Sequence, residues 1–194
     1  DEEIELWRNR TLGEYNYLIL DATYENVRIG NKVVSVAVLV CYGVNPFGKR
    51  SCLGVNVSTS EAEVHWRKFL ESLVERKLFG VKMITSDDHA GLKKALKAVF
   101  PGIMWQRCQF HLQQNAQKYI TKVEMKKEVA GDIRIIFNAP NYSEAERYLK
   151  LTIEKYQTKM PKLSEWMDLN LREGFTVFNL PESHRRKLRT SNMA

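Results

Sequence analysis

Apolar residues at the start of the chain are grouped as they are in β-strands. A first segment is rich in aromatic and β-branched residues, and a second is almost continuously apolar, which is typical of a strand covered on both faces. A third segment alternates, so that Leu53, Val55 and Val57 are expected on one face. Turn-forming residues at 43–48 indicate a hairpin between the second and third segments. The pattern predicts an antiparallel meander of strands over residues 15–28, 33–42 and 51–57.

A helical period replaces this alternation after Ser60. Ser60 and Glu63 have the spacing of a capping box, and apolar residues then recur on one helical face until Gly80 ends the pattern. Short apolar runs and amphipathic stretches alternate beyond it, which predicts alternating strands and helices. They are a strand over 81–85, a helix over 91–100, a strand over 103–106 and a helix over about 108–119.

Only helical patterns follow residue 121. Ser143 and Glu146 have the spacing of a second capping box, apolar residues form a helical stripe after them, and Pro161 ends that helix. No strand pattern is found after about residue 107. We therefore expect an α/β half followed by a helical half.

Composition narrows the class of protein. The 194 residues are 44% hydrophobic, which is enough for the core of one large domain or of one domain with an insertion. The longest apolar run is too short to span a bilayer, so we exclude membrane insertion. Three cysteines, Cys41, Cys52 and Cys108, are too few for a disulfide framework and indicate a reducing compartment. Because the chain begins with Asp1 rather than Met, we expect a fragment. The net charge of +7 is a weak indication of a polyanionic partner.

Two acidic residues, Asp21 and Asp87, are candidates for a metal site. Asp21 stands in the middle of the first predicted strand and Asp87 at the end of the fourth. Neighbouring strands lie about 5 Å apart, so the two carboxylates converge if these strands are adjacent. A bound Mg²⁺ or Mn²⁺ offsets the cost of burying such groups and suits phosphate chemistry. The alternatives are that Asp21 makes a cap or salt bridge at a strand end and that Asp87 caps the next helix.

A Cys–His pair and a basic run are less specific candidates. Cys108 and His111 share one face of a predicted helix at metal-ligand spacing, but no second Cys/His pair lies nearby to complete a zinc site. The alternative is a packed thiol beside a hydrogen-bonded imidazole. Residues 184–189 carry four fixed positive charges and no acid, which is compatible with phosphate contacts or with a solvated helix end.

Seven segments of the chain, in their order and spacing, carry a family resemblance. They include Ser-Asp-Asp-His at 86–89, Trp-Gln-Arg-Cys at 105–108 and Arg-Thr-Ser-Asn at 189–192. All seven lie within residues 20–28, 37–44, 86–92, 100–101, 105–111, 134–137 and 180–192. From about Trp7 to its end, the chain resembles the catalytic domain of bacterial insertion-sequence transposases of the Mutator-like superfamily.

The resemblance implies an RNase H-like fold, in which an antiparallel meander is followed by parallel strands with helices and by an all-helical insertion. It divides the chain into a catalytic core over 1–120, a helical insertion over 121–178 and a return to the core over 179–194. It implies a transposase that uses an Asp-Asp-Glu triad and two ions, Mg²⁺ or Mn²⁺, to cleave transposon ends and join them to target DNA. The implied partners are double-stranded terminal inverted repeats and target DNA, bound by a homodimer in the bacterial cytoplasm at the nucleoid.

Matching motifs assign roles to individual residues. Asp21 is similar to the first acid and Asp87 to the second, with Asp88 as the second choice. The neighbourhood of the active site comprises His89, Cys108 and His111, and the residues assigned to DNA phosphates are Arg107, Arg185, Arg186, Lys187 and Arg189. The third acid is expected just after Ala194, so we expect this chain to lack one ligand and to be inactive. The alternatives are an RNase H-like nuclease such as a resolvase and an inactive DNA-binding derivative.

Overall fold

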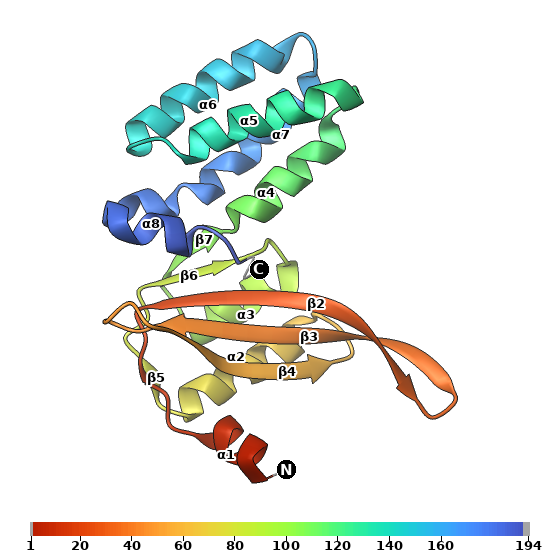
Figure 1. The fold of residues 1–194 in the computed structure, drawn as a ribbon, viewed down its shortest axis with the longest axis vertical. Coiled ribbons are helices and arrows are strands. Elements are labelled where there is room, and N and C mark those ends of the chain that lie inside the picture. Colours follow the sequence, from red (N-terminus) through yellow and green to blue (C-terminus); the bar gives the residue numbers. More distant parts are fainter. Residues whose placement is uncertain (1, 192–194) are drawn as a thin grey trace. The chain divides into compact units, whose positions relative to one another are not determined.

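The structure, a computed structural model, describes residues 2–191 and divides into two units between Trp105 and Gln106 (Figure 1). The first unit contains α1 (Glu2–Asn9), β1 (Gly13–Glu14), β2 (Tyr17–Ile29), β3 (Lys32–Val44), β4 (Arg50–Ser58), α2 (Glu63–Glu75), β5 (Leu78–Phe79), β6 (Met83–Ser86) and α3 (Ala90–Val99). Strand β7 (Met104–Arg107) crosses the division. Among the described residues no strand follows β7, and the predicted α/β half followed by a helical half is confirmed.

A mixed five-stranded sheet in the order β4-β3-β2-β6-β7 organises the first unit. Strand β3 pairs antiparallel with β2 on one side and with β4 on the other, which confirms the predicted meander. Strand β6 runs parallel to β2, with Ile19 opposite Thr85. Strand β2 therefore joins the antiparallel and parallel parts of the sheet. Strands β1 and β5 form a separate parallel pair.

Helices α2 and α3 cover one face of this sheet. Leu18 and Leu20 of β2 share a buried cluster with Trp66 of α2 and Leu92 of α3. Because side chains alternate along a strand, Asp21 points to the face opposite Leu20. Gly91 lets α3 approach the start of α2, since a Cβ at this position would collide with the Glu61 carbonyl oxygen.

A β-bulge changes which face the apolar residues of β4 occupy. Cys41 lies opposite Gly54 and Tyr42 lies opposite Cys52, so Leu53 is an extra residue in β4. A bulge shifts the alternation by one residue. Leu53 is fully buried, whereas Val55 and Val57 are 42% and 60% exposed. The prediction that these three side chains share one face is wrong.

The ends of β2 and β3 extend as a two-stranded ribbon beyond β4 (Figure 1). Pairing of β3 with β4 stops at Ala37, and the side chains from Thr23 to Ser35 are exposed. Val33, for example, is 64% exposed. The prediction of a strand covered on both faces therefore fails for the first residues of β3.

The second unit is helical. Its elements are α4 (Gln109–Ala116), η1 (Gln117–Tyr119), η2 (Val123–Met125), α5 (Lys126–Phe137), α6 (Tyr142–Gln157), α7 (Pro161–Asn170), η3 (Leu171–Gly174), η4 (Thr176–Asn179) and α8 (Glu182–Leu188). Leu112 of α4, Ile133 of α5, Leu149 of α6 and Met167 of α7 are fully buried in one cluster. The unit thus includes α4 and α8, which the resemblance assigns to the core. The division at 120/121 and 178/179 stays a prediction.

Both capping boxes expected from the sequence are absent from the described helices. Helix α6 begins one residue before Ser143, and its cap is Asn141, whose Oδ1 accepts a hydrogen bond from the Glu144 N–H at 2.9 Å. Asn is as effective a cap as Ser, and Asn141 precedes Ser143 in the sequence, so the helix begins after Asn141. Helix α2 has Ala62 at its N-cap, while Ser60 Oγ accepts from the Ala62 N–H in the preceding turn. The capping predictions are wrong although both helices form.

Candidate active site and nucleic-acid interface

The parallel pairing of β2 with β6 places Asp21 and Asp87 at matching positions. The last paired residues are Ile19 of β2 and Thr85 of β6. Asp21 and Asp87 each lie two residues beyond these positions in the sequence. Both side chains are partly buried. The condition set by the sequence, that these two strands be neighbours, is confirmed, and the acids lie at the same edge of the parallel pair.

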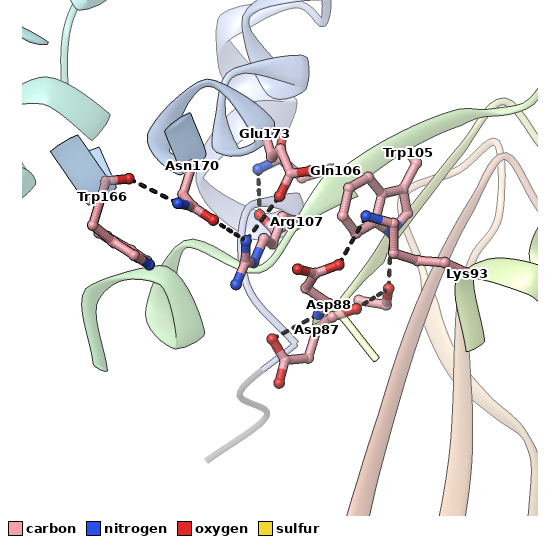
Figure 2. Close-up of polar contacts among 10 residues, drawn as sticks. Asp87, Asp88, Lys93, Trp105, Gln106, Arg107, Trp166, Asn170 and Glu173 are labelled. Carbon is pink, nitrogen blue, oxygen red and sulfur yellow. Dashed lines mark hydrogen bonds and ion pairs between the residues drawn. The ribbon is translucent and has the colours of Figure 1, made fainter. Parts of the chain in front are cut away.

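The alternative that Asp87 caps helix α3 is wrong. The N-cap of α3 is His89, and no side chain caps it. Asp87 Oδ1 instead accepts a hydrogen bond from the Asp88 N–H at 2.7 Å (Figure 2). Asp88, the second choice for this acid, is exposed and forms an ion pair with Lys93 at 2.8 Å. Asp87 is therefore the acid that the sheet register favours.

A buried hydroxyl supports the backbone at Asp87. Ser86 is fully buried, and its Oγ donates to the Asp87 carbonyl oxygen at 2.8 Å and accepts from the Trp105 indole N–H at 2.9 Å. Figure 2 shows Trp105 and Lys93 with the two aspartates. The Lys93 ammonium lies 4.5 Å from the centre of the Trp105 ring. These contacts hold the segment that follows β6 in one conformation.

Glu61 is a third acid at this site that the sequence reasoning missed. It precedes α2, its side chain is 16% exposed, and its Oε2 lies 4.0 Å from His89 Nδ1. Burial and the charges of Asp87 and Asp21 raise the pKa of Glu61, and the His89 ring opposes this shift. No local pattern singles Glu61 out, because only the folding of α2 against the sheet brings it near the two aspartates.

Asp21 and Asp87 offer the type of ligand that a hard divalent cation would need. Carboxylate oxygens are the ligands that Mg²⁺ and Mn²⁺ prefer, and Mg²⁺ needs only one or two of them when phosphates and waters complete its shell. Within residues 2–191, no group of three or more His, Cys, Asp or Glu is placed to hold a metal ion. The described residues therefore do not form a closed site of the structural zinc type.

Arg107 is directed into the helical unit. Its side chain is 6% exposed, and its Nη1 donates to Glu173 Oε2 at 2.8 Å and to Asn170 Oδ1 at 3.1 Å (Figure 2). Asn170 is held in turn by a hydrogen bond to the Trp166 carbonyl oxygen. A buried and paired guanidinium is poorly placed to contact DNA, so the structure does not favour the phosphate role predicted for Arg107.

Cys108 and His111 hold the segment near residue 190. The Ser191 N–H donates to Cys108 Sγ at 3.2 Å, the Thr190 hydroxyl lies 3.5 Å from the same sulfur, and Ser191 Oγ lies 3.5 Å from His111 Nδ1. Cys108 and Ser191 are fully buried. The alternative of a packed thiol near an imidazole describes this geometry, with a hydrogen-bonded segment added. Asn192, the last residue of the Arg-Thr-Ser-Asn motif, lies outside the described residues.

The ionisation of Cys108 gives a testable pH dependence. Burial alone raises the pKa of this thiol, but hydrogen bonds with His111, Ser191 and Thr190 outweigh burial and lower the pKa to about 6. Burial raises the pKa of Cys41 and Cys52. We therefore expect ultraviolet absorbance to report one thiolate that forms near pH 6 in the folded chain.

Stability should follow the same ionisation. The folded state releases the Cys108 proton near pH 6 and the unfolded state only near the ordinary value of 9. The unfolded state therefore binds more protons between these values, so the free energy of unfolding should rise with pH across this window. Cys108→Ser should remove the low-pH thiolate, while Cys52→Ser should keep it. A Cys108 thiol that stays protonated at pH 8 would contradict the assignment.

The basic run at 184–189 divides into internal and surface residues. Arg185 donates to the carbonyl oxygens of Leu180 at 2.9 Å and Pro140 at 2.7 Å, so it ties α8 to the loop before α6. Arg189 donates to Asn138 Oδ1 at 2.6 Å. Arg186 and Lys187 are exposed. Of the residues assigned to phosphates, Arg186 and Lys187 have the placement that such contacts need.

The sheet and its paired acids define an α/β protein with an acidic candidate catalytic site. The chain belongs to the Mutator family of transposases, because the family model described as "Transposase, Mutator family" matches residues 1–194. Within residues 2–191, no helix is both long enough and apolar enough to cross a membrane.

Curated relatives agree with this family. The chain is 53% identical over 192 residues to the transposase for insertion sequence element IS406 of Burkholderia multivorans, covering 99% of this chain and 50% of the relative. It is 32% identical over 191 residues to the transposase for IS256 in transposon Tn4001 of Staphylococcus aureus, covering 96% of this chain and 48% of the relative. The chain spans about half the length of these relatives.

Among solved structures, the chain is similar to the Drosophila P element transposase strand transfer complex. The TM-score is 0.36 and the identity 11%, over 89% of this chain and 50% of that chain. A similarity at this level supports no conclusion about function.

Proposed function

We propose that this chain is the catalytic core of a DNA transposase with an RNase H-like sheet. It cleaves the ends of a transposon and joins each freed 3′-hydroxyl to target DNA. The observation that carries the proposal is the matching position of Asp21 and Asp87 on two adjacent parallel strands, in a chain that belongs to a transposase family. Two acids placed in this way suit an ion shared with a phosphate group.

Asp21 and Asp87 are the residues that hold Mg²⁺ or Mn²⁺ in this proposal. Such ions, when bound as a pair, favour the attacking oxygen as a nucleophile and stabilise the charge on the leaving oxygen. Glu61 is a third carboxyl group near the two aspartates, and its Oε2 lies 4.0 Å from His89 Nδ1. The third acid of the triad follows Ala194 in this proposal. Cys108 and His111 hold Thr190 and Ser191, which directly precede that part of the chain.

Double-stranded DNA is the proposed partner, with terminal inverted repeats and target DNA bound by a homodimer. The excess of 30 Lys and Arg over 23 Asp and Glu favours a polyanion. Arg186 and Lys187 are exposed on α8, where both side chains are placed to contact phosphates. Within residues 2–191, no described hydrogen bond or ion pair would be lost by Arg186 in making such a contact. Contacts of this kind give affinity that falls with salt concentration.

The test is a cleavage and joining assay with a chain that extends past Ala194. We expect nicked and joined products from DNA that carries terminal inverted repeats when Mg²⁺ or Mn²⁺ is present. A chelator should remove these products, and added metal should restore them. DNA with scrambled ends is the matched control. Products that form equally well in chelator would contradict the proposal, and DNA binding without cleavage would favour the inactive DNA-binding derivative.

A further inference from the structure

A polar pocket in the helical unit includes several residues to which no role has been assigned. It has a volume of about 310 Å³ and is formed mainly by α4, α5 and the residues that follow α5 and α8. Its lining consists of Gln109, Phe110, Gln113, Arg134, Phe137, Asn138, Arg189 and Thr190. No acidic residue lines it. Its volume is at the lower end of the range typical of sites for small ligands.

The positive charge of this pocket is only partly compensated. Arg134 is exposed, and within residues 2–191 its guanidinium has no ion pair or hydrogen bond. Arg189 is held by Asn138, and burial together with the nearby Arg186 lowers the pKa of its guanidinium. An anionic ligand in the pocket would favour the charged form of Arg189 and offset its repulsion with Arg186.

A second pocket continues the first. It has a volume of about 590 Å³ and shares Phe137, Asn138 and Arg189 with the first pocket. Arg185 and Arg186 also line it, against a single acid, Glu182. Arginines therefore follow one another along both pockets, as they do in grooves that track a phosphate backbone.

An exposed aromatic ring distinguishes the first pocket from a plain anion site. Phe110 is 40% exposed although it is a large apolar side chain, and its ring meets His111 at 67°, edge to face, with 5.6 Å between centroids. The amide of Gln113, which donates and accepts hydrogen bonds, lines the same pocket. An aromatic ring, an amide and a guanidinium together match the base and phosphate of a nucleotide.

We propose that this pocket binds one unpaired nucleotide of a DNA strand. The base stacks on Phe110, the Gln113 amide forms a hydrogen bond with the base edge, and the exposed Arg134 contacts the adjacent phosphate. A paired base in a duplex stays stacked between its neighbours, and a pocket of about 310 Å³ admits a single nucleotide rather than a helix. The inference rests on the proposed function, because it specifies a form of the DNA that this chain binds.

The test compares three oligonucleotides of equal length at one salt concentration. They are a single strand, the same strand with abasic sites, and a blunt duplex. The wild-type chain should bind the single strand more tightly than its abasic form. Phe110→Ala should weaken binding of the single strand by about tenfold, within the range of base–aromatic stacking, and change duplex binding by less than about twofold.

Variants separate stacking from charge and from folding. Phe110→Trp should restore single-strand affinity, and Phe47→Ala, at a phenylalanine that is 93% exposed in a turn of the first unit, should leave it unchanged. Arg134→Gln should weaken the normal and abasic strands equally. The melting temperature of each variant should match the wild type, because Phe110 and Arg134 are exposed.

Three results would overturn the proposal. Equal affinity for normal and abasic strands would exclude a base pocket, as would an unchanged affinity in Phe110→Ala. If the duplex is still bound in those cases, only the nucleotide-binding role of the pocket is rejected, and the proposed function stands. If the wild-type chain binds none of the three oligonucleotides, the proposed function fails together with the pocket.

Discussion

Asp21→Asn or Asp87→Asn is expected to abolish cleavage and joining in the extended chain while DNA affinity stays close to the wild-type value. The register of β2 and β6 places both acids at one edge of the sheet, where each carboxylate would hold the divalent ion. Asparagine keeps the size of the side chain and removes its charge. We expect joining to fall by about a thousandfold or more, as when an active site loses one preorganised electrostatic group. Gel analysis of end cleavage and joining measures the loss.

Asp88→Asn is the matched control for these two variants. Asp88 is adjacent to Asp87 but exposed and paired with Lys93, so its replacement should leave most of the activity. DNA affinity, measured in parallel, separates a loss of chemistry from a loss of binding. Full activity in Asp21→Asn would exclude the proposed metal site.

Local patterns were enough to predict the order of the main elements. The periodicity of hydrophobic residues, which depends only on residues close in sequence, predicts the strands of the meander. It also predicts helices α2 and α3 and the helical second half. The neighbouring positions of Asp21 and Asp87 could be stated only as a condition. Whether β2 lies next to β6 depends on how the sheet orders its strands, and this order involves residues far apart in the chain.

The larger features that the sequence did not reveal depend on contacts between distant segments. The bulge at Leu53 depends on its pairing with β3, and Glu61 joins the site only because α2 packs on the sheet. The partners of Arg107 lie in α7 and η3, more than fifty residues further along the chain. The family resemblance could therefore assign Arg107 to DNA phosphates, but only the fold shows that its side chain is buried.

The surroundings of Arg107 lead to the second large prediction. Arg107→Ala should lower the free energy of unfolding of the helical unit by about 2 to 3 kcal/mol. The substitution removes an ion pair with Glu173 and a hydrogen bond to Asn170 from a largely buried position. The expected loss is below the range for a fully buried pair because the Glu173 side chain is 34% exposed. Denaturant unfolding followed by circular dichroism measures it.

Arg186→Ala is the matched variant on the surface, and it should show the opposite behaviour. Its stability should stay within about 0.5 kcal/mol of the wild type, as expected for an exposed side chain. Its DNA affinity should fall, and the slope of log affinity against log salt should decrease in size by about 0.9, the value for one lost phosphate contact. If Arg107→Ala instead kept its stability and lost DNA affinity with the same change of slope, Arg107 would be the phosphate contact that its motif suggests. Arg107 would then have to exchange Glu173 for DNA on binding.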